Sequence, residues 1–245
     1  METSRANGAA YVLGAFLLGA FVCAGLLGLG YWATRGALDV KAMERSVTVK
    51  GLAEREVPAD IAIWPIRFTD TGNDLVALYQ TVQEHNSQVL GFLAKQGFKQ
   101  DEISVSPPSI VDRQAQGYVN SNDIQFRYTA TSTITVYTPD VERVRQGMTR
   151  LADLGKEGIA ISGADMGAAA QFLFTGLNDL KPAMIEAATR NAREVASKFA
   201  ADSDSRLGKI RRASQGLFSI QDRDSNTPYI KKVRVVSTVE YYLAD

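Results

Sequence analysis

The chain has 245 residues and a formal net charge of zero at pH 7, because 27 Lys and Arg side chains balance 27 Asp and Glu side chains. That length allows one sizeable core or two smaller ones, and the charge balance argues against a nucleic-acid partner, since such proteins usually carry a basic excess. The single cysteine, Cys23, excludes a disulfide within the chain. It lies in an apolar segment, so the rest of the chain has no thiol nucleophile and no thiolate metal site.

The N-terminal part is an apolar segment, Ala6–Thr34, which holds no charged residue and is flanked by Arg5 and Arg35. About 20 helical residues cross the roughly 30 Å apolar core of a bilayer. Residues 1–35 are therefore predicted to form a short cytoplasmic N-terminus and one uncleaved transmembrane helix. Amphipathic rings favour the two membrane–water boundaries, and the predicted interface residues are Tyr11, Tyr31 and Trp32.

Two other interpretations of this segment are weaker. A cleaved signal peptide has a shorter apolar core, and a lipoprotein signal needs a small residue before the cysteine, where this chain has Val22. Small residues also recur four apart, and such rows permit close approach of membrane helices, although glycine and alanine are common in membrane helices anyway. The two rows are Ala15, Gly19, Cys23 and Ala20, Ala24, Gly28.

Residues 36–45 form a mixed-charge linker, and residues 46–245 are predicted to fold as one domain, undivided or with two subdomains. Hydrophobic periodicity and turn residues place the elements in this domain. In chain order we expect strands over 46–57 and 61–69, a helix over 73–96, strands over 103–106 and 124–138, a helix from Asp140, extended segments over 159–161 and 171–174, a helix from Asn178 or Asp179, and strands over 209–219 and 230–243. This order, ββαββαβαββ, predicts an α+β fold of antiparallel sheet packed by helices.

Several local features refine this prediction. Gly51 interrupts the first strand as glycines at bulges do, and Pro65 cannot donate a ladder bond, which predicts an edge or a bulge in the second strand. Residues 112–123 are polar and predict an exposed hairpin loop. The longest helix of the domain should lie close to a sheet through small alanines, with an inner face of Met184, Ala188, Ala192, Val195 and Phe199.

Two motifs at the start of the domain resemble the opening of SIMPL-domain proteins, formerly a domain of unknown function. They are Val47-x-Val49-x-Gly51 and Val57-Pro58-Ala59-Asp60-Ile61-Ala62, although Ala53 replaces a second glycine and Ala59 separates Pro58 from Asp60. The strand with Tyr128-x-Ala130 and the alanine-rich helix ending in Leu207-Gly208-Lys209 are similar too, so the resemblance covers about Ser46 to Leu243.

The resemblance implies an envelope protein, usually periplasmic or secreted in bacteria. Bacterial relatives are linked to oxidative-stress defence, some form large homo-oligomeric rings, and a eukaryotic relative is a signalling adaptor. The family supplies no catalytic residue to transfer. The charge count conflicts with this location, since Arg35, Lys41, Arg45 and Lys50 follow the apolar segment and cations favour the cytoplasmic side. We give the resemblance more weight and expect a single-pass inner-membrane protein with a periplasmic domain.

The residues give no catalytic, cofactor or metal site. His85 is the only histidine, and a histidine base or metal site needs partners that neither another histidine nor a soluble cysteine supplies. The acidic pairs Asp202/Asp204 and Asp222/Asp224 have the spacing of calcium ligands but lack the later glycine and glutamate of an EF-hand. Solvated turns explain them better.

A group of cations on the closing strands is the one candidate contact surface, for anionic lipid or a protein partner, with an ordinary solvated sheet face as the alternative. Its residues are Lys209, Arg211, Arg212, Lys232 and Arg234, with Lys231 adjacent. The sequence thus predicts a membrane-anchored, non-enzymatic envelope protein that acts through homo-oligomerisation and contacts with an unidentified protein, with a role in stress defence. The alternatives are a small-ligand or enzymatic domain with an unrecognised pocket, and a cytosol-facing signalling adaptor.

Overall fold

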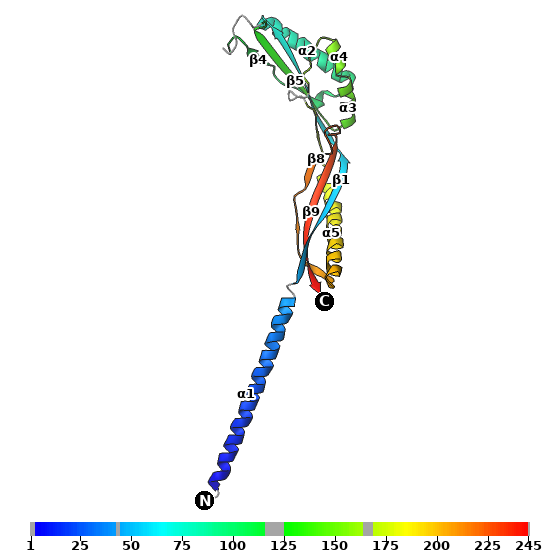
Figure 1. Ribbon diagram of the computed structural model, residues 1–245. Helices are drawn as coiled ribbons and strands as arrows, with labels where there is room; N and C mark the ends of the chain where they lie inside the picture. Colours follow the sequence, from blue (N-terminus) through cyan, green and yellow to red (C-terminus); the bar gives the residue numbers. More distant parts are fainter. Residues whose placement is uncertain (1–2, 43–44, 116–124, 164–168, 245) are drawn as a thin grey trace. The chain divides into compact units, whose positions relative to one another are not determined.

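The computed structural model describes residues 3–42, 45–115, 125–163 and 169–244, with the backbone alone for residues 3–15 and 37–42 (Figure 1). Its elements are α1 (Thr3–Ala42), β1 (Ser46–Pro58), β2 (Ile61–Gly72), α2 (Leu75–Lys95), the 3-10 turn η1 (Gln100–Glu102), β3 (Ile103–Val105), β4 (Ser109–Asp112), β5 (Tyr128–Thr138), α3 (Val141–Thr149), α4 (Ala152–Lys156), β6 (Gln171–Leu173), α5 (Leu177–Asp202), β7 (Arg206–Gln215), β8 (Ser219–Asp222) and β9 (Ile230–Ala244).

The chain divides into two compact units. Unit 1 comprises Met1–Ala53, Ile185–Leu217 and Val235–Asp245, and unit 2 comprises Glu54–Met184 and Phe218–Arg234. Both sheets are antiparallel and packed by helices, so the predicted α+β class is confirmed.

The N-terminal helix α1 exposes large apolar side chains, with Phe16 at 73% and Trp32 at 78% of their full accessibility. Tyr31 is also exposed, and the Arg35 guanidinium lies 5.0 Å from the centre of its ring. The side chain of Tyr11 is outside the described residues. A helix was predicted here as a membrane span, but in the described ranges no helix has the combined length and apolar character needed to cross a membrane.

Unit 2 is built on a five-stranded sheet of order β3-β5-β2-β6, with β4 also paired to β5. β2 and β5 pair from Ala62↔Thr138 to Gly72↔Tyr128, and α2 lies along one face of them (Figure 1). Trp64, Ile66 and Phe68 fill the core beneath this helix. Asp74 caps α2 by accepting the Ala77 N–H at 2.8 Å, and Gly97 follows the helix with φ of +87°, so the helix agrees closely with the predicted range of residues 73–96.

Pro65 lies opposite Thr135 of β5, and on the other side of β2 it falls between two short partners. One partner is β6, which pairs with Ile61–Ile63, and the other is the single bridge of Phe68 to Ile161. β2 is therefore not the predicted edge strand, since β5 and β6 flank it. Pro65 is tolerated because, among the described residues, no strand pairs with β2 at its position on the β6 side.

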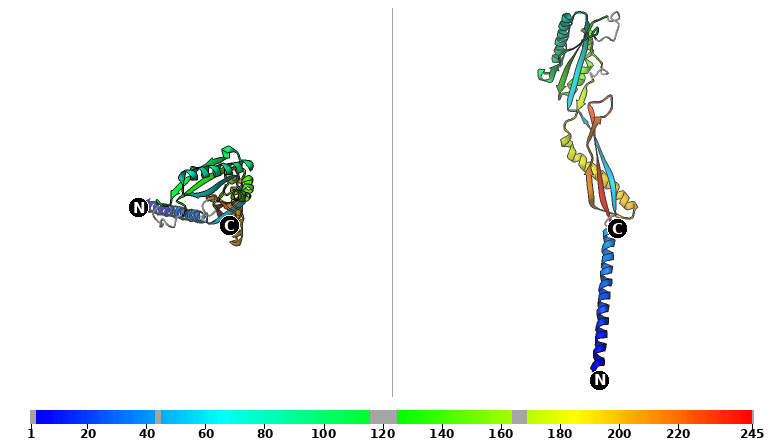
Figure 2. Two further views of the ribbon diagram at one scale, coloured as in Figure 1. Left: turned by 90° about the horizontal axis from the view of Figure 1, so that it is seen from above. Right: turned by 90° about the vertical axis from the view of Figure 1, so that its left-hand side faces the viewer.

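In unit 1, α5 packs on the sheet of order β1-β9-β7 (Figure 2). The predicted inner face is partly wrong, because Ala196 and Ala200 are buried whereas Val195 and Phe199 are exposed. The reason is the distance between helix and sheet. A Cβ on Gly51 would lie 2.5 Å from Ala192 N and 2.9 Å from Ala192 Cβ, so the two backbones almost touch and only alanine fits between them. Gly51 thus serves close packing of the helix on the sheet.

The remaining differences are local. The short strands β4 and β8 were not predicted, and β5 begins at Tyr128 instead of residue 124. Most of the predicted loop at residues 112–123 lies outside the described residues. Short strands escape a pattern analysis because three or four residues carry too little periodicity to be recognised.

Candidate functional site

In unit 1, the cations of the predicted basic patch divide between two surroundings. Arg211 Nη1 lies 2.9 Å from Glu240 Oε1, and the Ser46 hydroxyl donates to the same oxygen at 2.6 Å. The Ser46 bond, assisted by Arg211 and Arg212, holds the pKa of Glu240 below its ordinary value. The charges of Arg211 and Arg212 are therefore compensated by the Glu240 carboxylate, whereas Lys209 lines a hollow between α5 and β7.

In unit 2, the other cations of the patch are also paired. Lys232 Nζ lies 3.1 Å from Glu54, and Arg234 Nε lies 3.7 Å from the same carboxylate. Lys231 pairs with Asp222. Exposed pairs of this kind contribute little to stability, but they cancel most of the local positive charge. A role for these cations in binding a partner stays a prediction.

A hollow of about 480 Å³ lies between α5 and β7 in unit 1, and we call it the α5–β7 hollow. Its lining residues are Arg193, Leu207, Gly208, Lys209, Ile210 and Tyr241. The pairing of β7 with β9 shifts register between Leu207 and Ile210, so two residues of β7 stand opposite the single residue Tyr242. Gly208 is needed there, because a Cβ would lie 2.9 Å from Tyr242 O.

The polar groups of the α5–β7 hollow lack partners. Arg193 and Lys209 make no hydrogen bond or ion pair with any residue that the structure describes. Tyr241 is only 1% exposed, and its buried hydroxyl has no hydrogen-bond partner in the described chain. The lining of the hollow therefore includes two cations without a partner, one tyrosine whose hydroxyl is unsatisfied, and the apolar residues Leu207 and Ile210.

A second feature of unit 1 is the free edge of β1. Among the described strands β1 pairs with β9 alone. Arg45 O accepts the Leu243 N–H at 2.9 Å, so odd-numbered residues of β1 direct their backbone groups at β9. Thr48, Lys50 and Leu52 then direct theirs away from the sheet. The Asn191 amide supports this, since it donates to Leu52 O at 2.8 Å from α5.

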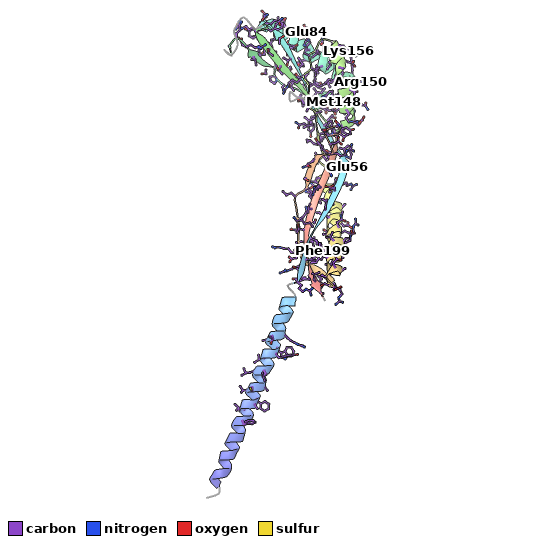
Figure 3. All side chains as sticks on the ribbon, viewed as in Figure 1. Glu56, Glu84, Met148, Arg150, Lys156 and Phe199 are labelled. Atoms are coloured by element: carbon purple, nitrogen blue, oxygen red, sulfur yellow. The ribbon has the colours of Figure 1, made fainter. Side chains whose placement is uncertain are left out.

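Apolar side chains of α5 lie beside this edge. Val195 and Phe199 follow Asn191 at intervals of four residues and so share its side of the helix. Ala192 and Ala196 pack with Val49, which shows that α5 runs along β1 toward its beginning. Phe199, which Figure 3 labels on α5, is 55% exposed. The edge and this apolar row together form a surface that could receive another strand.

A hollow of about 530 Å³ in unit 2 lies between α3, β6 and the turn before β9. Phe172 and Tyr229 meet edge to face with ring centres 6.1 Å apart, and the Arg145 guanidinium lies 3.9 Å above the Tyr229 ring. Met148, labelled in Figure 3, also lines it. Its cation already has a partner, since Arg145 pairs with Glu142, whereas the two cations of the α5–β7 hollow have none among the described residues.

His85, Asp222 and Asp224 each have structural partners. His85 Nδ1 lies 3.0 Å from Asp70, and its ring meets Phe68 edge to face. Asp222 pairs with Lys231, and Asp224 accepts backbone N–H bonds from Asn226 and Thr227. The Thr227 hydroxyl and Arg223 also donate to Asp224, and these bonds lower its pKa to about 2.

Of the polar residues that line the α5–β7 hollow, the sequence predicted a contact role for Lys209 but not for Arg193 or Tyr241. The available signal was Gly208, since a glycine within a strand pattern indicates a bulge or a close backbone approach.

Comparison with protein families gives one result for the whole domain. Residues 47–240 match the SIMPL family, described as a protein of unknown function (DUF541). Among curated proteins, none matches the chain. The match covers most of the 245 residues and includes both units apart from α1. The chain therefore belongs to the SIMPL family.

Proposed function

We propose that this chain is a non-enzymatic envelope protein that is attached to a membrane through α1 and acts by self-association through the free edge of β1. The observation that carries the self-association is the edge itself. Thr48 and Lys50 face outward and offer both backbone groups, and Leu52 offers its N–H, since its carbonyl already accepts the Asn191 amide. The apolar row of Val195 and Phe199 lies alongside. An exposed strand edge beside apolar side chains is a template for pairing with a second chain.

Two observations support membrane attachment and the absence of catalysis. The described part of α1 exposes Phe16, Phe21 and Trp32, and such apolar surface favours a lipid environment over water. His85, the only histidine, is bonded to Asp70, and in the described chain no hydroxyl bonds to its ring. Contact with a protein partner and a part in stress defence remain proposals that extend from the family.

Self-association is tested with the full-length chain in a neutral detergent by sedimentation equilibrium. Thr48→Pro removes one outward N–H and leaves the ladder with β9 intact, so we expect a folded protein whose association is at least about tenfold weaker. Phe199→Glu should have a similar effect. Leu217→Glu is the matched control, because Leu217 is 96% exposed but lies at the end of the β7 segment, away from β1.

A folded Thr48→Pro variant that associates as strongly as the wild type would contradict the proposed edge. Equal losses in Phe199→Glu and Leu217→Glu would also contradict it, because they would indicate general apolar attraction. Attachment is tested by alkaline carbonate extraction of membranes, in which release of the full-length chain would refute it. Paired alkaline phosphatase and fluorescent-protein fusions after Asp245 distinguish a periplasmic domain from the cytosol-facing adaptor.

A further inference from the structure

We propose that the α5–β7 hollow binds the phosphate group of an organic phosphate, with Arg193, Lys209 and the Tyr241 hydroxyl as donors. This ligand site goes beyond the proposed self-association, which uses the opposite edge of the same sheet. Other cations nearby do not share this capacity, since Arg211 is already paired with Glu240. Arg193 and Lys209 line one hollow and have no partner among the described residues.

The buried hydroxyl is the second and independent observation. Tyr241 is 1% exposed, and its hydroxyl finds no partner in the described chain. Buried polar groups are nearly always hydrogen-bonded, so the unsatisfied hydroxyl of a tyrosine that lines the hollow points to an absent acceptor. An anion supplies such acceptors and at the same time compensates the two cations.

The backbone of β7 adds to this arrangement. The register shift leaves Gly208 and Lys209 opposite one residue of β9, so this stretch lies outside the regular ladder. Amide groups released by such irregularities commonly contribute to anion sites.

The lining selects the kind of anion. Two cations and a hydroxyl match the charge and the several acceptor oxygens of phosphate better than a single carboxylate. Leu207, Ile210 and the Tyr241 ring form apolar walls next to these donors. A volume of about 480 Å³ is within the range of small-molecule sites, so the ligand should carry an apolar portion beside its phosphate.

Two sources of such a phosphate are possible, a lipid headgroup and a soluble metabolite. Tyr241 and Leu243 are two residues apart, which corresponds to about 7 Å along a strand. The Leu243 N–H donates to Arg45 O. Arg45 follows the end of α1 at Ala42 by three residues, which span at most about 11 Å. The apolar segment ends at Thr34, eight residues before Ala42, and these residues add about 12 Å of helix. A lipid source therefore requires that α1 is held in a membrane with the hollow close to its surface, so it rests on the proposed attachment, whereas a soluble phosphate does not.

The experiment uses the full-length chain in dodecyl maltoside micelles and isothermal titration calorimetry. The soluble probes are inorganic phosphate and glycerol 3-phosphate, and the lipid probe is dioleoyl phosphatidic acid doped into the micelles, with phosphatidylcholine for comparison. Arg193→Met and Lys209→Met should each weaken binding about tenfold, and Tyr241→Phe about threefold. Arg212→Met, on the same strand but paired electrostatically with Glu240, is the matched control and should leave the affinity within about twofold.

A second readout separates a ligand role of Tyr241 from a packing role. In the absence of ligand, Tyr241→Phe should raise the Tm, because it removes a buried donor without a partner. Binding of either soluble probe or of phosphatidic acid, with loss in the Arg193 and Lys209 variants, would support the site and assign its source. Absence of binding to every probe up to about 10 mM, or equal affinity in Lys209→Met and Arg212→Met, would overturn it. Self-association is measured separately, so its failure would leave this result unaffected.

Discussion

Replacing Gly51 by alanine tests the close packing on which unit 1 depends. The added Cβ would lie 2.5 Å from Ala192 N and 2.9 Å from Ala192 Cβ, and it would be closer still to Ala188 O. Atoms of this kind are comfortable at about 3.5 Å, so α5 must move away from β1 by about 1 Å. The obstacle is helix backbone, which cannot rotate aside as a side chain can.

The expected cost follows from this displacement. A gap of about 1 Å removes roughly half of the dispersion energy of each contact, here those of Ala188, Ala192 and Ala196 with the sheet. Overpacking substitutions commonly cost about 1–3 kcal/mol, and a backbone obstacle places Gly51→Ala near about 3 kcal/mol. For a chain of this size, that corresponds to a fall in Tm of roughly 6–12 °C.

The assay is urea and thermal unfolding of the full-length chain, followed by circular dichroism in detergent. Gly91→Ala is the matched control, because no atom lies within 4 Å of the Cβ position and Gly91 is inside α2. That control should stabilise the protein by about 0.5–1 kcal/mol through helix propensity. The conformation of Gly51 itself is acceptable to alanine, so a Gly51→Ala variant within about 0.5 kcal/mol of the wild type would refute the steric reasoning.

The other predictions concern unit 2. Gly147→Ala places a Cβ 2.9 Å from Trp64 Cζ3, and because this obstacle is a side chain we expect a loss of about 1–2 kcal/mol with a shift in Trp64 fluorescence, measured in a Trp32→Phe background. Asp224 has its pKa lowered to about 2, chiefly by the Thr227 hydroxyl, so its contribution is present above about pH 4 and lost as the pH falls toward 2. The stability difference between the wild type and Asp224→Asn should therefore disappear over that interval in urea unfolding at stepped pH. Glu54→Gln removes an exposed carboxylate shared by two cations and should change the unfolding free energy by less than about 0.5 kcal/mol.

Much of the fold could be predicted because local chemistry determined it. The helix α2, which starts after the Asp74 cap and ends before Gly97, and the strand β2 lie close to the predicted ranges 73–96 and 61–69. The face of α5 was predicted only in its first half. Val195 and Phe199 were predicted as core residues in preference to Ala196 because their side chains are larger and apolar. The distance between α5 and β1 at Gly51, however, leaves space for one methyl group alone. The size of the side chain, and not its hydrophobicity, therefore determines which residues of α5 are buried. The distance between the helix and the sheet depends on tertiary packing.

The α5–β7 hollow was less predictable. Lys209 was grouped with Arg211 because the two lie near each other along one strand. Their surroundings depend on the register shift in β7, which is defined only by the partner strand β9. Arg193 is separated from Lys209 by the end of a helix and a turn, and the lack of a partner for Tyr241 is visible only when its neighbours are known. Pairing and burial are relations between distant residues, and a single sequence does not contain them.

The two proposed surfaces meet on one helix. Asn191 and Phe199 belong to the side of α5 next to β1, and Arg193 belongs to the side that lines the hollow with β7. Both sides are positioned by the alanine row that Gly51 allows to lie against the sheet. A change that displaces α5, such as Gly51→Ala, should therefore weaken self-association and phosphate binding together. Phe199→Glu and Arg193→Met act on one side each and should separate the two effects, which makes their comparison the most direct test of how unit 1 works.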